Sequence, residues 1–189
     1  MFIDRNSQIN YARKYGIPIP KDKKGAPPFS VDDNLFHTST EGKVLENPKN
    51  SAPEFIFQRT VSPEKSPNKP NFVTINFKKG DPIAVNGRKS SPSKLLEKLN
   101  KIAGKNGIGR VDLVENRFIG IKSRGVYETP GGTLLMNAHR AIESVTLDKD
   151  TMHKKDQIMP RYAELIYNGY WYSKERFKLQ KIVDLKKNK

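Results

Sequence analysis

The order of periodic segments along the chain constrains its fold more than any other feature of the sequence. The alternation of apolar and polar residues that is typical of a half-buried strand runs over 71–78, and strand-like segments return over 111–114 and 118–127. Helical periodicity follows, over about 133–147, 151–169 and 173–187. Strands followed by helices are typical of α+β proteins. We therefore predict an α+β domain with antiparallel strands followed by helices.

Turn residues and helix ends support this division in the middle of the chain. Asn86-Gly87 predicts a tight turn after a short strand over 83–85, and so an antiparallel strand pair. Ser91-Pro92 is a typical helix start, and Gly104 is a typical helix end. The leucines between them recur at helical spacing, which predicts a helix with one buried face.

The first third of the chain contains fewer periodic segments. A short helix is predicted over 6–15, with Gly16 as its C-terminal stop. The proline-rich segment that follows, to residue 67, is predicted to be ordered loop and irregular strand. Further along, Pro160 is predicted to kink or restart the second of the C-terminal helices.

Composition excludes several classes of protein. A chain of 189 residues can form one sizeable domain, but its 35% hydrophobic content and mean hydropathy of -0.73 indicate reliance on other surfaces for stability. Cysteine is absent, which excludes disulfides, cysteine-ligated zinc and a thiol nucleophile. Because no segment resembles a signal peptide or the roughly 20 apolar residues of a membrane span, we expect a cytoplasmic protein with no membrane partner.

The formal net charge of +15 raises the question of a nucleic-acid partner. The basic residues are scattered along the chain, and lysine outnumbers arginine, whereas phosphate and guanine recognition favours arginine. Recognition motifs for nucleic acid are missing as well. We therefore favour a solvated basic surface, or an acidic partner domain, over a nucleic-acid site.

Several short patterns are weak candidates for chemistry. The glycine-rich segment 104–110 lacks the phosphate-loop order and leads into a predicted strand, so a flexible connection is favoured over a nucleotide site. The histidines are too dispersed for a metal site, and the aromatic segment 170–172 favours helix packing over base stacking. Three acidic residues are open to both an acid-base role and a turn-capping role: Asp32, Asp33 and Glu41.

The segment 114–130, VENRFIGIKSRGVYETP, departs most from the pattern of a structural strand. It places charged clusters and glycines where a strand prefers apolar and β-branched residues. Such local inconsistency is typical of functional sites. A charged edge strand that avoids association with other strands is the alternative.

Four segments together resemble the argininosuccinate synthase family. They cover nearly the whole chain in order, and they are YARKYGIPIP, FSVDDNLFHTSTEGKVLENP, GIGRVDLVENRFIGIKSRGVYETPGGTLL and DKDTMHKKDQIMPRYAELIYNGYWYS. The resemblance implies the catalytic and multimerisation domain of that family over 17–189, truncated at its C-terminal end. Residues 1–16 then correspond to a remnant helix and linker from a nucleotide-binding domain.

The resemblance also implies a substrate site. In the family, the positions that match Ser30, Ser39, Glu115 and Tyr127 contact citrulline. A carboxylate such as Glu115 can pair with an α-ammonium group, and hydroxyl groups can bond carboxylate or ureido oxygens. These are binding roles, and no catalytic residue is assigned.

The implied reaction is the ATP-dependent ligation of citrulline and aspartate. The ureido oxygen of citrulline attacks the α-phosphate of ATP and releases pyrophosphate, and the aspartate amine then displaces AMP. ATP, with Mg²⁺, is expected to bind in an N-terminal half that this sequence lacks, so no ATP-binding residue is assigned and no resident metal is expected. The family's homotetramer is a further implied partnership.

Three interpretations follow from the sequence. The first is a fragment or split subunit of the synthase, predicted to make no argininosuccinate alone. The second is a non-catalytic citrulline-binding or regulatory protein derived from the synthase. The third, supported by charge alone, is a nucleic-acid-binding protein whose affinity falls steeply with salt.

Overall fold

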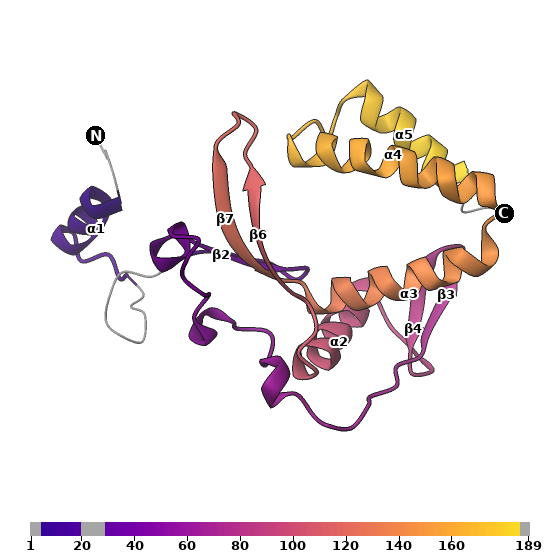
Figure 1. The fold of residues 1–189 in the computed structure, drawn as a ribbon, viewed down its shortest axis with the longest axis horizontal. Helices are drawn as coiled ribbons and strands as arrows, with labels where there is room; N and C mark the ends of the chain where they lie inside the picture. The colour runs from indigo at the N-terminus through magenta and orange to yellow at the C-terminus, as the bar shows by residue number, and fades with distance from the viewer. Residues whose placement is uncertain (1–4, 20–28, 186–189) are drawn as a thin grey trace.

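The computed structural model describes residues 5–19 and 29–185, and it confirms the α+β class (Figure 1). The N-terminal helix α1 spans Arg5–Lys14 and is followed by Gly16 at φ 66°, as the sequence predicted. The remaining described elements form two antiparallel sheets, a pair of packed helices and a C-terminal helical hairpin. None of the described helices is long and apolar enough to cross a membrane.

The larger sheet joins a hairpin from the first third of the chain to a second hairpin from its centre. Its strands are β1 (Ser30–Asp33), β2 (Thr38–Glu41), β6 (Arg110–Asn116) and β7 (Lys122–Glu128), in the spatial order β1-β2-β7-β6. All neighbouring strands are antiparallel. Two local hairpins are therefore joined by one non-local pairing, that of β2 with β7.

The turn between β6 and β7 corrects one prediction. The sequence predicted a second strand from residue 118, but 117–121 form the turn. Gly120 adopts φ 85°, and hydrogen bonds from Gly120 to Arg117 and from Arg117 to Ile121 close the turn. Phe118 and Ile119 have strong strand propensity, yet they lie exposed at the hairpin tip, so propensity misplaced the boundary.

One face of this sheet is covered by the segment that follows β2. Short 3-10 helices η1 (Lys43–Glu46), η2 (Glu54–Ile56) and η3 (Pro63–Lys65) interrupt this segment. A small core forms between the segment and the sheet, from Phe29, Leu45, Ile56 and Val126.

Polar bonds also fasten the segment to the sheet. Arg124 pairs with Asp112 at 2.8 Å and donates to three backbone carbonyls of the segment. The hydrogen bond to Arg124 holds the pKa of Asp112 below its usual value, against a smaller opposing effect of burial. Hydrogen bonds as well as apolar contacts therefore hold this segment against the sheet.

The second sheet packs with two helices around the main apolar core. Its strands are β3 (Ile75–Lys78), β4 (Asp81–Val85) and β5 (Arg88–Lys89). Asn86 and Gly87, at φ 51° and 73°, form the predicted tight turn between β4 and β5. Helices α2 (Pro92–Lys105) and α3 (Pro130–Thr146) lie against each other.

Apolar burial stabilises this core. Leu95 and Leu99 on α2 are almost fully buried with Val85, and each such side chain contributes about 1.5–3 kcal/mol. Gly131 allows the close approach of α3, because an added Cβ would lie 2.6 Å from the Asn100 side-chain oxygen. The predicted helix and its buried stripe are confirmed.

The C-terminal hairpin consists of α4 (Lys149–Tyr167) and α5 (Lys174–Leu185). Helix α4 continues across Pro160, so the helix does not restart there, and the alternative of a kink stays a prediction. Figure 1 shows that α4 runs back above α3 and that its C-terminal end approaches the tip of the β6–β7 hairpin. An ion pair between Arg140 and Asp156, at 2.7 Å, joins the N-terminal half of α4 to α3.

Candidate functional site

The strand register places the four predicted substrate residues on one face of the larger sheet. Ser39 lies directly opposite Tyr127, and Tyr127 lies opposite Val111. Glu115 is four positions after Val111 on the same strand, so its side chain points to the same face. Ser30 reaches this face from β1, two positions along the register from Asp32, the partner of Ser39. We call this surface the site face.

The four residues are not equally close to one another. Glu115 lies close enough to Tyr127 for its carboxylate to raise the pKa of the phenol. Ser39 is buried beside Tyr127, whereas Ser30 is exposed on the outer strand opposite Glu41. The sheet therefore forms a compact centre at Glu115 and Tyr127, with one hydroxyl beside it and another further along the face.

Gly125 explains how the tyrosine reaches the carboxylate. A Cβ built at Gly125 would lie 2.8 Å from two atoms of the Tyr127 side chain, so the ring lies directly over the glycine. Gly125 is opposite Leu113, two positions before Glu115, and the ring therefore leans along β7 toward Glu115. A glycine in a strand usually marks such a close approach.

Two residues outside the predicted set complete the charged centre. The Arg117 Nη2 lies 2.6 Å from a Glu41 carboxylate oxygen, and its Nε lies 3.4 Å from Glu115. The attraction of Glu41, and more weakly that of Glu115, raises the pKa of Arg117. Two carboxylates thus share one guanidinium, which leaves the centre with an excess of one negative charge. Such a site is complementary to a small cationic group.

The structure separates the three acidic residues considered from the sequence, and Asp32 lies opposite Ser39 on the site face. Glu41 pairs with Arg117 on the site face, whereas Asp33 points to the opposite face, where it accepts a 2.6 Å hydrogen bond from Thr38 and pairs with Arg59. The hydrogen bond from Thr38, aided by Arg59, lowers the pKa of Asp33. Asp33 thus fits the turn-holding role.

Other candidate patterns lie elsewhere. Within residues 5–19 and 29–185, no group of three or more metal-ligating His, Cys, Asp or Glu side chains is present. The guanidinium of Arg176 lies 4.7 Å from the Trp171 ring centroid, and it donates to the Trp171 carbonyl at 2.7 Å. This supports the interpretation of the aromatic segment as packing at the helical hairpin.

Tyr127 is expected to ionise late. Burial, reinforced by the Glu115 carboxylate, raises the pKa of Tyr127 to about 12 from its usual 10.0. Because the folded-state pKa is raised, this group stabilises the fold below pH 10 or so and the contribution is lost as the pH rises through about 12. In an ultraviolet absorbance titration we expect a late step, the ionisation of tyrosine near pH 12, and Tyr127→Phe should remove one tyrosine from it.

A second variant tests the cause of that shift. Glu115→Gln removes the negative charge next to Tyr127 and should move the late step to lower pH. If Tyr127→Phe leaves the late step unchanged, the assignment of that step to Tyr127 is wrong.

Comparisons with known proteins support the resemblance seen in the sequence. The family model described as the arginosuccinate synthase C-terminal domain matches residues 29–189. The argininosuccinate synthase of Pelagibacter ubique is 84% identical over 185 residues, covering 98% of this chain and 47% of the relative. Those of Roseobacter denitrificans and Cereibacter sphaeroides are 61% and 60% identical over 180 residues, covering 95% of this chain and 44% of each relative.

These matches extend across both sheets, including the strands that carry the site face, and across the helices from α2 to α5. The chain spans about half the length of the curated relatives it matches. The family model and the ordered identity together establish that this chain belongs to the argininosuccinate synthase family, as its C-terminal domain.

Proposed function

We propose that this chain supplies the citrulline-binding part of an argininosuccinate synthase. The complete carbon-nitrogen ligase would join citrulline to aspartate and convert ATP to AMP and pyrophosphate. The observation that carries the proposal is the site face, on which Ser30, Ser39, Glu115 and Tyr127 occur together around a centre of excess negative charge.

The chemistry of these groups matches an α-amino acid. The Glu115 carboxylate can accept a charge-assisted hydrogen bond from the α-ammonium group of citrulline, which is stronger than a bond between neutral groups. Arg117 balances Glu41 and so leaves the charge of Glu115 for the ligand. The Ser30 and Ser39 hydroxyls lie along the same face and can donate to carboxylate or ureido oxygens.

We assign ATP, its Mg²⁺ and aspartate to another part of the complete enzyme. The glycine-rich segment 106–109 connects α2 to strand β6, whereas a phosphate loop opens a helix with its free backbone N–H groups. Its residues do not fit a triphosphate. The role of this chain is then to hold and orient the citrulline on which ATP acts, a contribution that proximity and alignment make large.

Citrulline binding by the full chain tests the proposal directly. We expect isothermal titration calorimetry to detect L-citrulline binding without ATP, and N-acetylcitrulline, which lacks the α-ammonium charge, to bind about 100-fold more weakly. Equal affinity for the two compounds, or no binding of citrulline, would overturn the assignment of the site face. No AMP should form when the chain is incubated with ATP, citrulline and aspartate.

A chimera tests the catalytic half of the proposal. The matching 185 residues of the Pelagibacter ubique synthase are replaced by those of this chain. We expect citrulline-dependent AMP formation and, by light scattering, the homotetramer that we propose for the complete enzyme. A folded chimera that binds citrulline but forms no AMP would favour the alternative function, a non-catalytic citrulline-binding protein.

A further inference from the structure

The side chain of Arg117 extends from the β6–β7 turn back over the site face. Its Nη2 contacts both carboxylate oxygens of Glu41, at 2.6 and 2.7 Å, and its Nε lies 3.4 Å from a carboxylate oxygen of Glu115. The hydroxyl oxygen of Ser123 lies 3.4 Å from the same Nη2. One guanidinium therefore lies between carboxylates from β2 and β6, with a hydroxyl of β7 beside it.

We propose that Arg117 is a specificity-determining residue, which makes the site face select an α-amino acid with a neutral side chain and reject one with a cationic side chain. The inference rests on the proposed function, because it assumes that Glu115 receives the α-ammonium group of the ligand. It assigns to Arg117 an effect on the wrong ligands, in addition to its pairing with Glu41.

The charges at the centre favour a ligand with one positive group. Without Arg117, the carboxylates of Glu41 and Glu115 would complement a ligand with two positive groups, such as arginine or ornithine with its α-ammonium and its side-chain cation. Arg117 supplies the second cation from within the chain, and a guanidinium is not deprotonated in proteins. One negative charge is then left for the ligand. It matches the single ammonium group of an amino acid with an uncharged side chain, such as citrulline.

The strand register places the Glu41–Arg117 pair in the path of the ligand. Ser30 lies opposite Glu41, and Glu41 lies opposite Gly125 of β7. Glu115 is on β6, the strand on the other side of β7. A ligand that contacts both Glu115 and Ser30 therefore passes this pair. A cationic side chain there finds no free carboxylate at Glu41 and is repelled by Arg117.

Burial distinguishes these carboxylates from Asp32, which also lies on the site face. Asp32 is exposed on the outer strand opposite Ser39, so solvent and salt screen its charge. The side chains of Glu41 and Glu115 are only 26% and 17% exposed. Their charges, and the compensating charge of Arg117, therefore affect a bound ligand most strongly.

Calorimetric titration of the full chain with L-citrulline, L-arginine and L-ornithine tests the inference. We expect the wild-type chain to bind citrulline at least about 30-fold more tightly than either cationic amino acid. Arg117→Gln frees Glu41 for a second cation, and it should lower this ratio about tenfold, mainly by tightening the binding of arginine and ornithine. Arg117→Lys keeps the positive charge and should restore most of the wild-type ratio.

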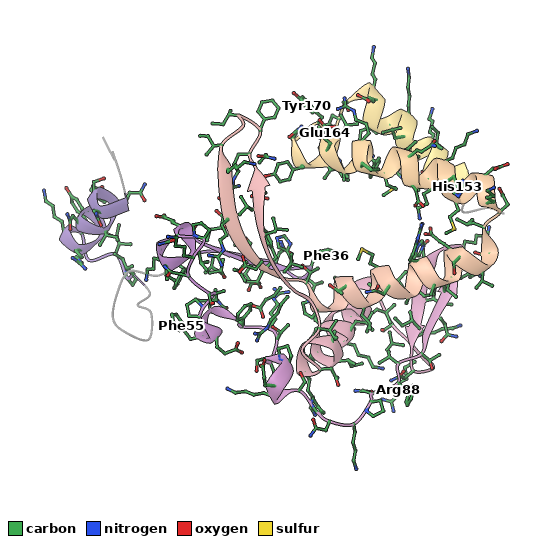
Figure 2. The ribbon with its side chains drawn as sticks, viewed as in Figure 1. Phe36, Phe55, Arg88, His153, Glu164 and Tyr170 are labelled. Atoms are coloured by element: carbon green, nitrogen blue, oxygen red, sulfur yellow. The ribbon has the colours of Figure 1, made fainter. Side chains whose placement is uncertain are left out.

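Two further variants separate selectivity from structure. Arg117→Gln combined with Glu41→Gln removes the freed carboxylate, so the gain in arginine affinity should disappear. Arg161 offers the matched control, because its guanidinium also contacts two carboxylates, those of Glu164 and Glu175, at 2.8 Å each. Figure 2 shows Glu164 on α4, outside the sheet. Arg161→Gln should leave the affinities for citrulline and arginine within about twofold of the wild type.

The outcomes distinguish this inference from the proposed function. If the wild-type chain binds citrulline but binds arginine equally well, or if Arg117→Gln leaves the ratio unchanged, the selective role of Arg117 is overturned and the proposed function stands. A merely structural role would weaken all three ligands by the same factor and so leave the ratio unchanged. If the wild-type chain binds no citrulline, both proposals are overturned.

Urea denaturation shows whether each variant is folded. If Arg117→Gln does not fold, Glu41→Gln decides the question, because it leaves Arg117 with Glu115 as its remaining carboxylate partner at the centre. Arg117 then competes with the ligand for Glu115, and the affinity for citrulline should fall about tenfold. An unchanged affinity in a folded Glu41→Gln variant overturns the inference.

Discussion

Replacing Glu128 by alanine is expected to lower the free energy of unfolding by about 3–5 kcal/mol, a large part of the stability of an ordinary domain. The Glu128 residue is 2% exposed, and its carboxylate accepts backbone hydrogen bonds from Gln58, Arg59 and Thr60 at 2.8–3.0 Å. The Thr60 hydroxyl adds a fourth bond, at 2.6 Å. Alanine leaves these donors without their acceptor, and the buried groups of Thr60 carry the largest desolvation cost. Urea denaturation followed by circular dichroism measures the change.

Two further variants sharpen this prediction. Glu128→Gln keeps the volume and one acceptor oxygen, so the expected loss is about half as large. Glu97→Ala removes an exposed carboxylate from α2 and should change stability by less than about 0.5 kcal/mol. A Glu128→Ala loss no larger than that of Glu97→Ala would show that the segment after β2 is not held by Glu128.

Glu115→Gln is expected to weaken citrulline binding about 100-fold while the fold stays intact. The side chain keeps its size, but the negative charge that complements the α-ammonium group is lost. Arg117 retains Glu41 as its partner, which limits the structural effect of the change. Calorimetric titration of citrulline measures the loss, and the urea midpoint measures the stability.

The matched control is Glu97→Gln, the same change of charge in an exposed pair with Lys101 on α2. It should leave citrulline affinity within about twofold of the wild type, because exposed pairs far from a site contribute little. Equal losses from Glu115→Gln and Glu97→Gln would mean that net charge, and not the site face, sets the affinity.

Local signals predicted much of the fold. The Asn86-Gly87 turn and the helix after Ser91 depend on residues close in sequence, and both lie where the patterns placed them. The β6–β7 turn was misplaced because Phe118 and Ile119 carry strand propensity although they lie at an exposed tip. Strand propensity describes how well a residue fits a half-buried pleated surface. It does not indicate the position of the turn between two strands.

The candidate site was less accessible from sequence. The family resemblance pointed to Ser30, Ser39, Glu115 and Tyr127, but their common face depends on the register of four strands. Arg117 looked like a residue of a polar connection between two strands. Only the β6–β7 turn and the pairing of β2 with β7 bring Arg117 to Glu41 and Glu115.

The pairing of β2 with β7 also dictates the order in which the molecule can assemble. The β1–β2 and β6–β7 hairpins each need contacts within a short stretch and can form in microseconds. Their union, which sets Thr38 against Glu128, must first close a long chain loop and is therefore slow. During synthesis one edge of β2 stays unpaired until β7 emerges from the ribosome. We therefore expect the site face to be complete only after β7 has paired with β2.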